Sequence, residues 1–513
     1  MQDHRRALAR SSSGIAILAG AGVFSGFLVD AAMAAIFGAD AGTDAFFIAG
    51  TIPFALASLL LASVNQVIVP VVHRWFEEAP PADALRRVGG LLGTSLAGGI
   101  GVAALGAALS SVLPILLAPG ASSDTQRAAI AMTALLFTTV VTRIGAEILR
   151  SVLNARFSFV GPAAMPLVEN GTVLGAILLL WGRLGVPAVA VGYVAGGVLQ
   201  LGFVGALAAR RGLLVRPTVR LRDPEIRSAF RLLALPLSGT GLTMLARAAE
   251  RFLASFLPAG QITILNYAWR IVNSIGGAIF FRSVVVALLP RLSAARGDAS
   301  ATRQIVADGI RLMTLISIPL LGFVVVLADP AVSLAFQRGA FGAAETALLA
   351  SVVAVYALQF PFDALNRVYV TYWYARFDTM VPFVNVALGV ALDIAFAVLL
   401  FVPLGIHGIA LGYVLSSVGY LIHGARSVHR RIRLPGPSLV RTVARVALAS
   451  VLTSGTAWLV LFAMPEGAGL VAKLVRLAVP GAAGVAVLAI VLAALRFRIW
   501  SLLRPTPTDP HVP

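Results

Sequence analysis

A group of charged residues lies within two apolar stretches near the middle of the chain. The stretches span 228–257 and 261–290, and a short turn makes them a helical hairpin. Their charged residues near the hairpin core are Arg247, Glu250, Arg251, Arg270 and Arg282. An ionisable side chain at membrane depth costs about 2.5–3.5 kcal/mol on insertion scales, and such residues commonly mark a binding site or pathway. The hairpin therefore predicts one half of a cationic cavity.

The arginines of this hairpin suit an anionic substrate. Arg247 and Arg270 each lie roughly 14 Å from the turn at 1.5 Å per residue, about halfway across a membrane. Arg247 and Arg251 outnumber Glu250, so the local charge is positive. The planar guanidinium group binds phosphate oxygens in pairs. We predict the following substrate-binding residues: Arg247, Glu250, Arg251, Arg270, Arg282 and Asp30.

Two other pairs of charges have the spacing of one helical face. Arg143 and Glu147 occupy one predicted span, and Asp363 and Arg367 occupy another. Four residues apart, the two charges of each pair can partly neutralise each other. We predict that these four residues form charge pairs that join or gate helices.

A structural role is also the alternative for the arginines of the hairpin. They can snorkel to the membrane surface, or they can pair with acids on other predicted helices. The candidate acids are Asp30, Glu169 and Asp393.

The composition is that of an all-α integral membrane protein. The 513 residues are 59% hydrophobic and only 12% charged, with a mean hydropathy of +0.92, whereas soluble domains carry about 25% charged residues. The net charge of +18 comes from arginines scattered over short loops. Nucleic-acid binding needs one basic face, so we expect no nucleic-acid partner and assign these arginines to anionic lipid headgroups.

The residue types argue against a metal site, a cofactor or an enzyme active site. The chain has no cysteine, and its six histidines show no metal-ligand spacing. A membrane glycosyltransferase or ligase needs a large external loop with catalytic acids. The longest predicted external loop has about a dozen residues. We therefore predict no catalytic residues, no metal and no cofactor.

Apolar runs long enough to cross a hydrocarbon core of about 30 Å recur along the whole chain. We predict fourteen spans, at 11–37, 44–72, 84–114, 126–153, 158–181, 186–209, 228–257, 261–290, 304–328, 342–375, 380–402, 405–429, 440–464 and 468–496. Arginine is concentrated in every second connection, which places those loops and both termini in the cytoplasm.

An internal repeat divides the predicted spans. Ala155-Arg156-Phe157 recurs as Ala375-Arg376-Phe377, and Leu184-Gly185 recurs as Leu404-Gly405, both at an offset of 220 residues. Six spans per repeat give two lobes of parallel orientation, with a substrate site expected between them. The predicted divisions are an N-terminal lobe at 1–212, a linker at 213–227, a C-terminal lobe at 228–433, and a final helix pair with a tail at 434–513.

Several motifs resemble one family of membrane transporters. They are Phe37–Phe47 (FGADAGTDAFF), Leu257–Arg270 (LPAGQITILNYAWR), Phe336–Thr346 (FQRGAFGAAET) and Ala375–Thr379 (ARFDT). Together they resemble the MviN/MurJ-type lipid II flippases of the multidrug/oligosaccharidyl-lipid/polysaccharide exporter superfamily. The similarity extends over nearly the whole chain.

The resemblance implies a function and a location. Family members move an undecaprenyl-pyrophosphate-linked glycan, typically lipid II, from the inner to the outer leaflet by alternating access. It implies residence in the bacterial inner membrane, a role in peptidoglycan synthesis, and partners among membrane lipids and cell-envelope biosynthesis proteins. A multidrug or cation antiporter of the same superfamily is one alternative, although its cavity is expected to be acidic and aromatic. A scaffold that transports nothing is another.

The first two spans depart from the family pattern. The family resembles Arg-x-x-Gly-x-x-Arg-Asp in the first span, but this chain has Val23 and Val29 at the arginine positions and keeps Asp30. Thr51 stands where a basic residue is usual. The resemblance therefore implies an asymmetric cavity, in which the arginines that hold the anionic group come from the second lobe.

Overall fold

The structure, a computed structural model, is built from helices, as predicted. It describes the backbone of residues 2–465, 467 and 469–494, and the side chains of these residues except 2–13, 15–16, 59–66, 234–240 and 278–279. Within these ranges no strand occurs. The predicted class, an all-helical membrane protein, is confirmed.

Many of the helices can cross a membrane. In the described ranges, eleven helices are long and apolar enough by length and composition, or up to twelve if one bent pair counts as a single span. Large apolar side chains are exposed on them, such as Leu179 at 81% and Val402 at 84%, as expected for surfaces that face lipid. The predicted total of fourteen spans stays a prediction.

The helices divide into two compact units. The first unit contains Met1–Ile264 and Arg338–Gly342, and the second contains Leu265–Gln337 and Ala343–Pro513. The predicted lobe boundaries at 212 and 228 stay a prediction. The helices of the first unit are α1 (Gln2–Phe37), α2 (Ala41–Glu78), α3 (Pro81–Ala108), α4 (Leu113–Leu117), α5 (Ser123–Ala155), α6 (Val160–Ala163), α7 (Met165–Leu184), α8 (Pro187–Arg210) and α9 (Pro224–Ala254).

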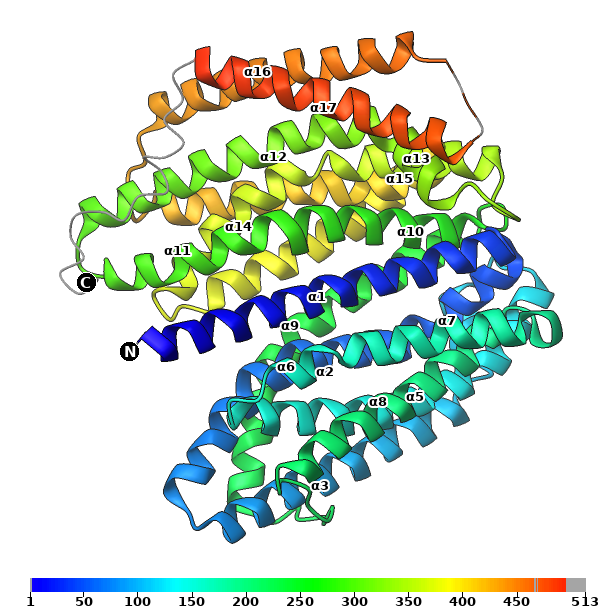
Figure 1. Cartoon of the computed structure of the whole chain (residues 1–513), viewed down its shortest axis with the longest axis vertical. Helices are drawn as coiled ribbons and strands as arrows, with labels where there is room; N and C mark the ends of the chain where they lie inside the picture. The colour runs from blue at the N-terminus through cyan, green and yellow to red at the C-terminus, as the bar shows by residue number, and fades with distance from the viewer. Residues whose placement is uncertain (1, 466, 468, 495–513) are drawn as a thin grey trace. The chain divides into compact units, whose positions relative to one another are not determined.

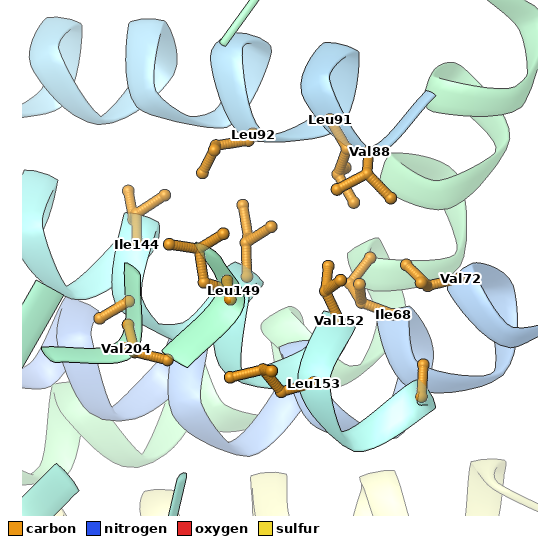
Figure 2. Packing of buried hydrophobic residues seen from close by; sticks show 14 of the residues in the cluster. Ile68, Val72, Val88, Leu91, Leu92, Ile144, Leu149, Val152, Leu153 and Val204 are labelled. Carbon is orange, nitrogen blue, oxygen red and sulfur yellow. The ribbon is translucent and has the colours of Figure 1, made fainter. Parts of the chain in front are cut away.

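Helix α5 is the centre of the first unit. It packs against α2, α3 and α8, which run beside it in Figure 1. Figure 2 shows the apolar cluster at this junction, in which Ile68, Leu91, Val152 and Val204 come from four different helices. Because lipid is as apolar as these side chains, close packing rather than exclusion of water holds such helices together. Small residues permit this close packing. A Cβ on Gly106 of α3 would lie 2.2 Å from the ring of Phe137 on α5.

Helix boundaries in this unit follow local capping signals. Asp40 caps α2: its carboxylate accepts from the Thr43 amide, and the Thr43 hydroxyl accepts from the Asp40 amide. Asp223 caps α9 by accepting from the Glu225 amide at 3.0 Å, and Pro224 occupies the first helical position. These short-range signals set where the long apolar helices begin.

The segment between α8 and α9 lies on a glycine-lined strip of α3. The Thr218 amide donates to the Gly89 carbonyl, and the Arg220 amide donates to the Thr94 hydroxyl, both at 2.9 Å. A Cβ on Gly93 would lie 2.3 Å from the Thr218 nitrogen. The predicted linker is therefore held against α3 by backbone contacts that only glycine allows.

Replacing Gly93 with alanine is expected to displace this segment. Overpacking of this kind costs about 1–3 kcal/mol. Gly98→Ala in the same helix is the matched control, because no atom lies within 4 Å of the Cβ that this alanine would add. Limited trypsin digestion measures the effect: cleavage after Arg220 should be faster in Gly93→Ala than in Gly98→Ala. Equal cleavage rates would contradict the packing described.

The second unit is organised around the long helix α12. Its helices are α10 (Gln261–Asn273, whose first turn belongs to the first unit), η1 (Ser274–Phe281), α11 (Arg282–Ala294), α12 (Ala299–Phe336), α13 (Ala343–Ala357), α14 (Phe360–Tyr374), α15 (Met380–His429), α16 (Gly436–Ala463) and α17 (Leu470–Ala494). Helices α13, α14, α16 and α17 all pack against α12. Figure 1 shows α16 and α17 lying along α12, where Leu315, Val446 and Leu492 form a buried cluster.

The predicted continuous helix over 261–290 is wrong in one respect. The structure inserts the π-helical turns of η1 between α10 and α11, and the helix bends by 43° between 261–277 and 282–294. Gly276 and Gly277 lie in η1, and a Cβ on Gly276 would lie 2.5 Å from the Phe360 ring. A glycine pair and π-turns are ordinary causes of a kink, and π-turns often occur at functional sites.

The backbone repeats itself at the offset found in the sequence. Among the described residues, Phe157 and Phe377 are the two non-glycine residues with positive φ, 57° and 59°. Each lies just after the end of a helix, and the amide of the residue that follows it donates a hydrogen bond back to a carbonyl of that helix. Ser158 donates to Leu153, and Asp378 donates to Trp373. Gly185 (φ 63°) and Gly405 (φ 54°) match as well. Gly405 kinks α15 into two helices, where the sequence predicts a boundary between spans.

Candidate functional site

The charged residues of α9 lie inside the first unit. Arg247 and Glu250 form an ion pair, with Nη1 and Oε2 2.7 Å apart, one helical turn from each other. The Glu250 side chain is only 8% exposed and that of Arg247 23%. Arg251 follows on the same helix and is half-buried. This segment of α9 therefore carries two guanidinium groups and one carboxylate.

The other predicted ligands are distributed over both units. Asp30 on α1 is buried at 5% exposure and belongs to the first unit. Arg270, half-buried on α10, and Arg282, at the start of α11, belong to the second. The binding role of these residues stays a prediction.

Arg143 has a partner on a different helix from the one expected. Its guanidinium pairs with Glu169 on α7, whose side chain is 9% exposed. Gln200 on α8 approaches the other oxygen of Glu169 at 3.5 Å and donates to the Met165 carbonyl at 3.1 Å. The Arg143 side chain also lies over the Phe54 ring at 5.9 Å. These contacts tie α2, α5, α7 and α8 together through one buried charge pair.

The remaining charges of this group pair along their own helices. Glu147 accepts from Arg150 at 3.2 Å, one turn further along α5. In the second unit Arg367 donates to Asp363 from both Nε (3.1 Å) and Nη2 (2.9 Å), as the spacing predicts. Tyr420 adds a contact to Asp363 at 3.5 Å. The gating role proposed for these pairs stays a prediction.

A buried carboxylate that sequence analysis did not select lies at the start of α2. Asp44 accepts three hydrogen bonds: from the Gly260 amide at 2.6 Å, the Thr263 amide at 2.8 Å and the Thr263 hydroxyl at 2.7 Å. Asp44 is 4% exposed and Thr263 is fully buried. A carboxylate that accepts from the first amides of a helix satisfies donors that have no partner within that helix. Asp44 therefore caps α10 from a different helix.

Thr43 completes this arrangement, and we call Thr43, Asp44, Gly260 and Thr263 the capping cluster. The hydroxyls of Thr43 and Thr263 are 3.0 Å apart, and the two residues are separated by 220 positions, the offset of the repeat. The signal for this contact was present in the sequence, as a shared threonine at the repeat offset inside two of the quoted motifs.

Glycines bring three backbone segments together around the capping cluster. A Cβ on Gly260 would lie 2.2 Å from the Ala39 carbonyl oxygen, and one on Gly339 would lie 2.1 Å from that of Ala35. Both glycines have positive φ, 90° and 58°. The Ala340 amide donates to the Ala35 carbonyl at 2.8 Å. The turn after α1, the turn before α10 and the segment 338–342 are thus closely packed.

Among the described side chains, no group of three or more metal-ligating residues is placed to hold a metal ion. Half-buried guanidinium groups such as those of α9 and α10 are side chains that can bind an anionic group. The capping cluster joins α2 to the start of α10 by hydrogen bonds and close contacts.

Comparison with known proteins gives the family. The family described as "Lipid II flippase MurJ" matches residues 33–479. The chain belongs to this family. A lipid II flippase MurJ of Burkholderia cenocepacia is 27% identical over 450 residues, which cover 84% of this MurJ-family chain and 86% of the relative.

The fold of this MurJ-family chain also matches solved structures. A structure of "Lipid II flippase MurJ, inward closed conformation" matches with a TM-score of 0.81 at 18% identity and covers 96% of this chain and 99% of that one. An inward-facing multidrug resistance transporter of the MATE family, from the MOP superfamily, matches with a TM-score of 0.64 at 15% identity over 83% and 95% of the two chains. This chain shares its fold with both structures.

Proposed function

We propose that this MurJ-family protein is a flippase for an undecaprenyl-pyrophosphate-linked glycan, with lipid II as its substrate. It moves the lipid from the inner to the outer leaflet of the bacterial inner membrane and serves peptidoglycan synthesis. The observation that carries the proposal is the family match over 33–479. The half-buried arginines of α9 and α10 support it, because a pyrophosphate group needs cationic partners inside an apolar bundle.

In this proposal the protein binds and moves its substrate without changing it chemically. Arg247, Arg251 and Arg270 hold the pyrophosphate, and Glu250 positions Arg247 through the 2.7 Å contact. The first span lacks the arginines usual in the family, so the anionic group is held from α9 and α10. The protein is then a transporter and no enzyme, with cell-envelope biosynthesis proteins as its partners.

Alternating access requires contacts that close one end of the pathway at a time. We assign this role to the capping cluster and place it on the outer side of the membrane, with both termini in the cytoplasm. Opening this end means breaking three hydrogen bonds to the buried Asp44 carboxylate. The substrate must therefore bind the open state more tightly than the closed state, because a ligand shifts a conformational equilibrium only by the difference between its affinities for the two states.

Complementation tests the function directly. The protein is expressed in a bacterium whose own lipid II flippase is under a repressible promoter. Growth and arrival of lipid II in the outer leaflet should continue after repression. Lipid extracted from the purified protein should contain a pyrophosphate-linked glycan by mass spectrometry. Lysis on repression, with stable expression of the protein, would reject lipid II as the substrate, and an extracted lipid with a different glycan would name the replacement.

Removing either central arginine is expected to impair transport strongly. A charge-assisted contact contributes about 1.5–3 kcal/mol, so Arg247→Ala or Arg270→Ala should lower transport roughly tenfold to a hundredfold. Arg247→Ala also leaves the buried Glu250 carboxylate without this partner. The control is therefore the double variant Arg247→Ala with Glu250→Gln, which should restore thermal stability but not transport. Full transport by both well-folded single variants would exclude the assigned site.

A further inference from the structure

The chain that joins α8 to α9 carries a dense group of positive charges. Residues 210–231, which we call the basic segment, contain seven arginines and two acids. Asp223 caps α9, and Glu225 accepts from Arg74 at 3.1 Å and from the Trp75 indole at 3.0 Å. The exposed arginines are Arg210, Arg211, Arg216, Arg222, Arg227 and Arg231. Within the described part of the chain these six form no ion pair, so the basic segment presents a strong positive charge.

The basic segment lies on an outward face of α3. The Thr218 amide donates to the Gly89 carbonyl, and a Cβ on Gly93 would lie 2.3 Å from the same nitrogen. Gly89 and Gly93 are one turn apart, and the same face of the helix continues at Ile100, two turns further along. Ile100 is 57% exposed. Because α3 is a candidate membrane span, this exposed apolar face is turned to lipid, and the basic segment covers its beginning.

The positions of the contacts along α3 indicate their depth in the membrane. Helix α3 has 28 residues, and its length of about 42 Å exceeds the hydrocarbon core by about 12 Å. Gly89 lies about 12 Å from the first residue, Pro81, and Thr94, which accepts from Arg220, lies about 20 Å from it. Even if all the excess length lies on this side, Gly89 is at the edge of the hydrocarbon layer. A water-soluble partner does not enter this layer, so the depth favours lipid.

Apolar side chains of the basic segment are exposed at this depth. Val219 and Leu221 are 60% and 69% exposed. Arg220 between them is half-buried, and its Cδ would lie 2.9 Å from a Cβ on Gly90 of α3. Val219 and Leu221 therefore point away from α3, while Arg222 follows Leu221 in a turn and is exposed beside it. Exposed apolar side chains combined with arginines, whose long stems reach the headgroups, are typical of interfacial segments.

We propose that the basic segment binds the headgroups of anionic phospholipids at the membrane face where α8 ends and α9 begins. Arg216 and Arg222, the exposed arginines that flank the apolar pair, are the ligands, and Val219 and Leu221 enter the acyl layer. In the proposed topology this face is cytoplasmic. The surface is independent of the proposed transport function, because it contains none of the arginines assigned to lipid II.

Quenching by brominated lipids tests this surface in the full chain. The natural chain contains no cysteine, so Val219→Cys accepts a single thiol-reactive fluorophore. The labelled protein is reconstituted into vesicles that contain no lipid II, with brominated phosphatidylglycerol or brominated phosphatidylcholine at the same mole fraction. Both lipids should quench the dye. The relative affinity for phosphatidylglycerol should be about fivefold higher, as expected for one arginine beside a headgroup.

Ile100→Cys is the matched control, because Ile100 lies on the same face of α3 beyond the basic segment. A dye at this position should be quenched equally by the two lipids. In the Val219→Cys protein, Arg216→Gln with Arg222→Gln should remove the preference for phosphatidylglycerol while quenching by phosphatidylcholine persists. Arg216→Lys with Arg222→Lys keeps both charges and should keep most of the preference.

Three results would overturn the proposal. Quenching of the Val219→Cys dye by neither lipid would place the segment in water, as a surface for a soluble partner. An equal preference for phosphatidylglycerol at Val219→Cys and Ile100→Cys would make it a property of the whole protein. An unchanged preference after both arginines are replaced by glutamine would exclude them as ligands. If Val219→Cys does not fold, Leu221→Cys replaces it, with the same results expected.

Discussion

Gly260→Ala is expected to disrupt the capping cluster and strongly reduce both stability and transport. The new Cβ would lie 2.2 Å from the Ala39 carbonyl oxygen, which is a backbone atom and cannot move aside as a flexible side chain could. The positive φ of 90° adds strain for any residue with a Cβ. Strain and overpacking together should lower the free energy of unfolding by about 2–5 kcal/mol. Thermal unfolding in detergent, followed by tryptophan fluorescence, measures this loss.

Gly297→Ala is the matched control for this substitution. Gly297 has a similar φ of 96°, but no atom lies within 4 Å of the added Cβ, so only the backbone strain of about 1–2 kcal/mol remains. The natural chain contains no cysteine, so a single Ala41→Cys substitution reports on access near the cluster. A membrane-impermeant thiol reagent should label it faster when Gly260→Ala is also present. Unchanged labelling and stability would refute the role assigned to the capping cluster.

Glu169→Ala is expected to have the second large effect. It leaves the part-buried Arg143 guanidinium, 22% exposed, without its carboxylate partner. Removing one partner of a buried ion pair typically lowers the free energy of unfolding by about 3–5 kcal/mol. An exposed ion pair contributes no more than about 1 kcal/mol. The melting temperature of the purified protein measures this loss. The double variant Arg143→Met with Glu169→Leu removes both charges and should recover most of the stability.

An exposed ion pair provides the comparison for that prediction. Asp124 and Arg127 are paired on α5, with side chains 82% and 77% exposed. Asp124→Ala should change the free energy of unfolding by no more than about 1 kcal/mol. If Glu169→Ala and Asp124→Ala have equal effects, the Arg143–Glu169 pair contributes little to holding α5 and α7 together.

The positions of the helices were largely predictable from the sequence, and the reason is physical. Apolar length and the placement of glycine decide where a membrane helix starts and stops. Gly185 and Gly405 illustrate this, because each ends one apolar run with the same positive-φ conformation. The break at η1 was not predictable in this way. Its glycine pair lies inside a continuous apolar run, and the close approach of Gly276 to Phe360 is a tertiary contact that no local pattern reveals.

The partners of the charged residues were less predictable than their depth. Helical spacing placed Asp363 beside Arg367, and the structure has that pair. The same spacing suggested Glu147 for Arg143, whereas the structure pairs Arg143 with Glu169. The contact between α5 and α7 is tertiary, so no local pattern reveals it. Asp44 was missed for a related reason. An acid in the first turn of a helix usually interacts with the amides of its own helix, whereas Asp44 accepts from the amides of Gly260 and Thr263 at the start of α10.

The capping cluster has a consequence for how the protein is made. The first repeat caps α2 with its own Asp40. The equivalent residue in the second repeat, 220 positions later, is Gly260, which has no side chain to offer, and α10 takes its cap from Asp44 instead. The start of α10 is therefore complete only after α2, synthesised more than two hundred residues earlier, has docked against it. Duplication supplied two similar halves, but the second half depends on the first to finish its fold. We expect this dependence to set an order of assembly in the membrane, with α2 in place before the start of α10 is capped.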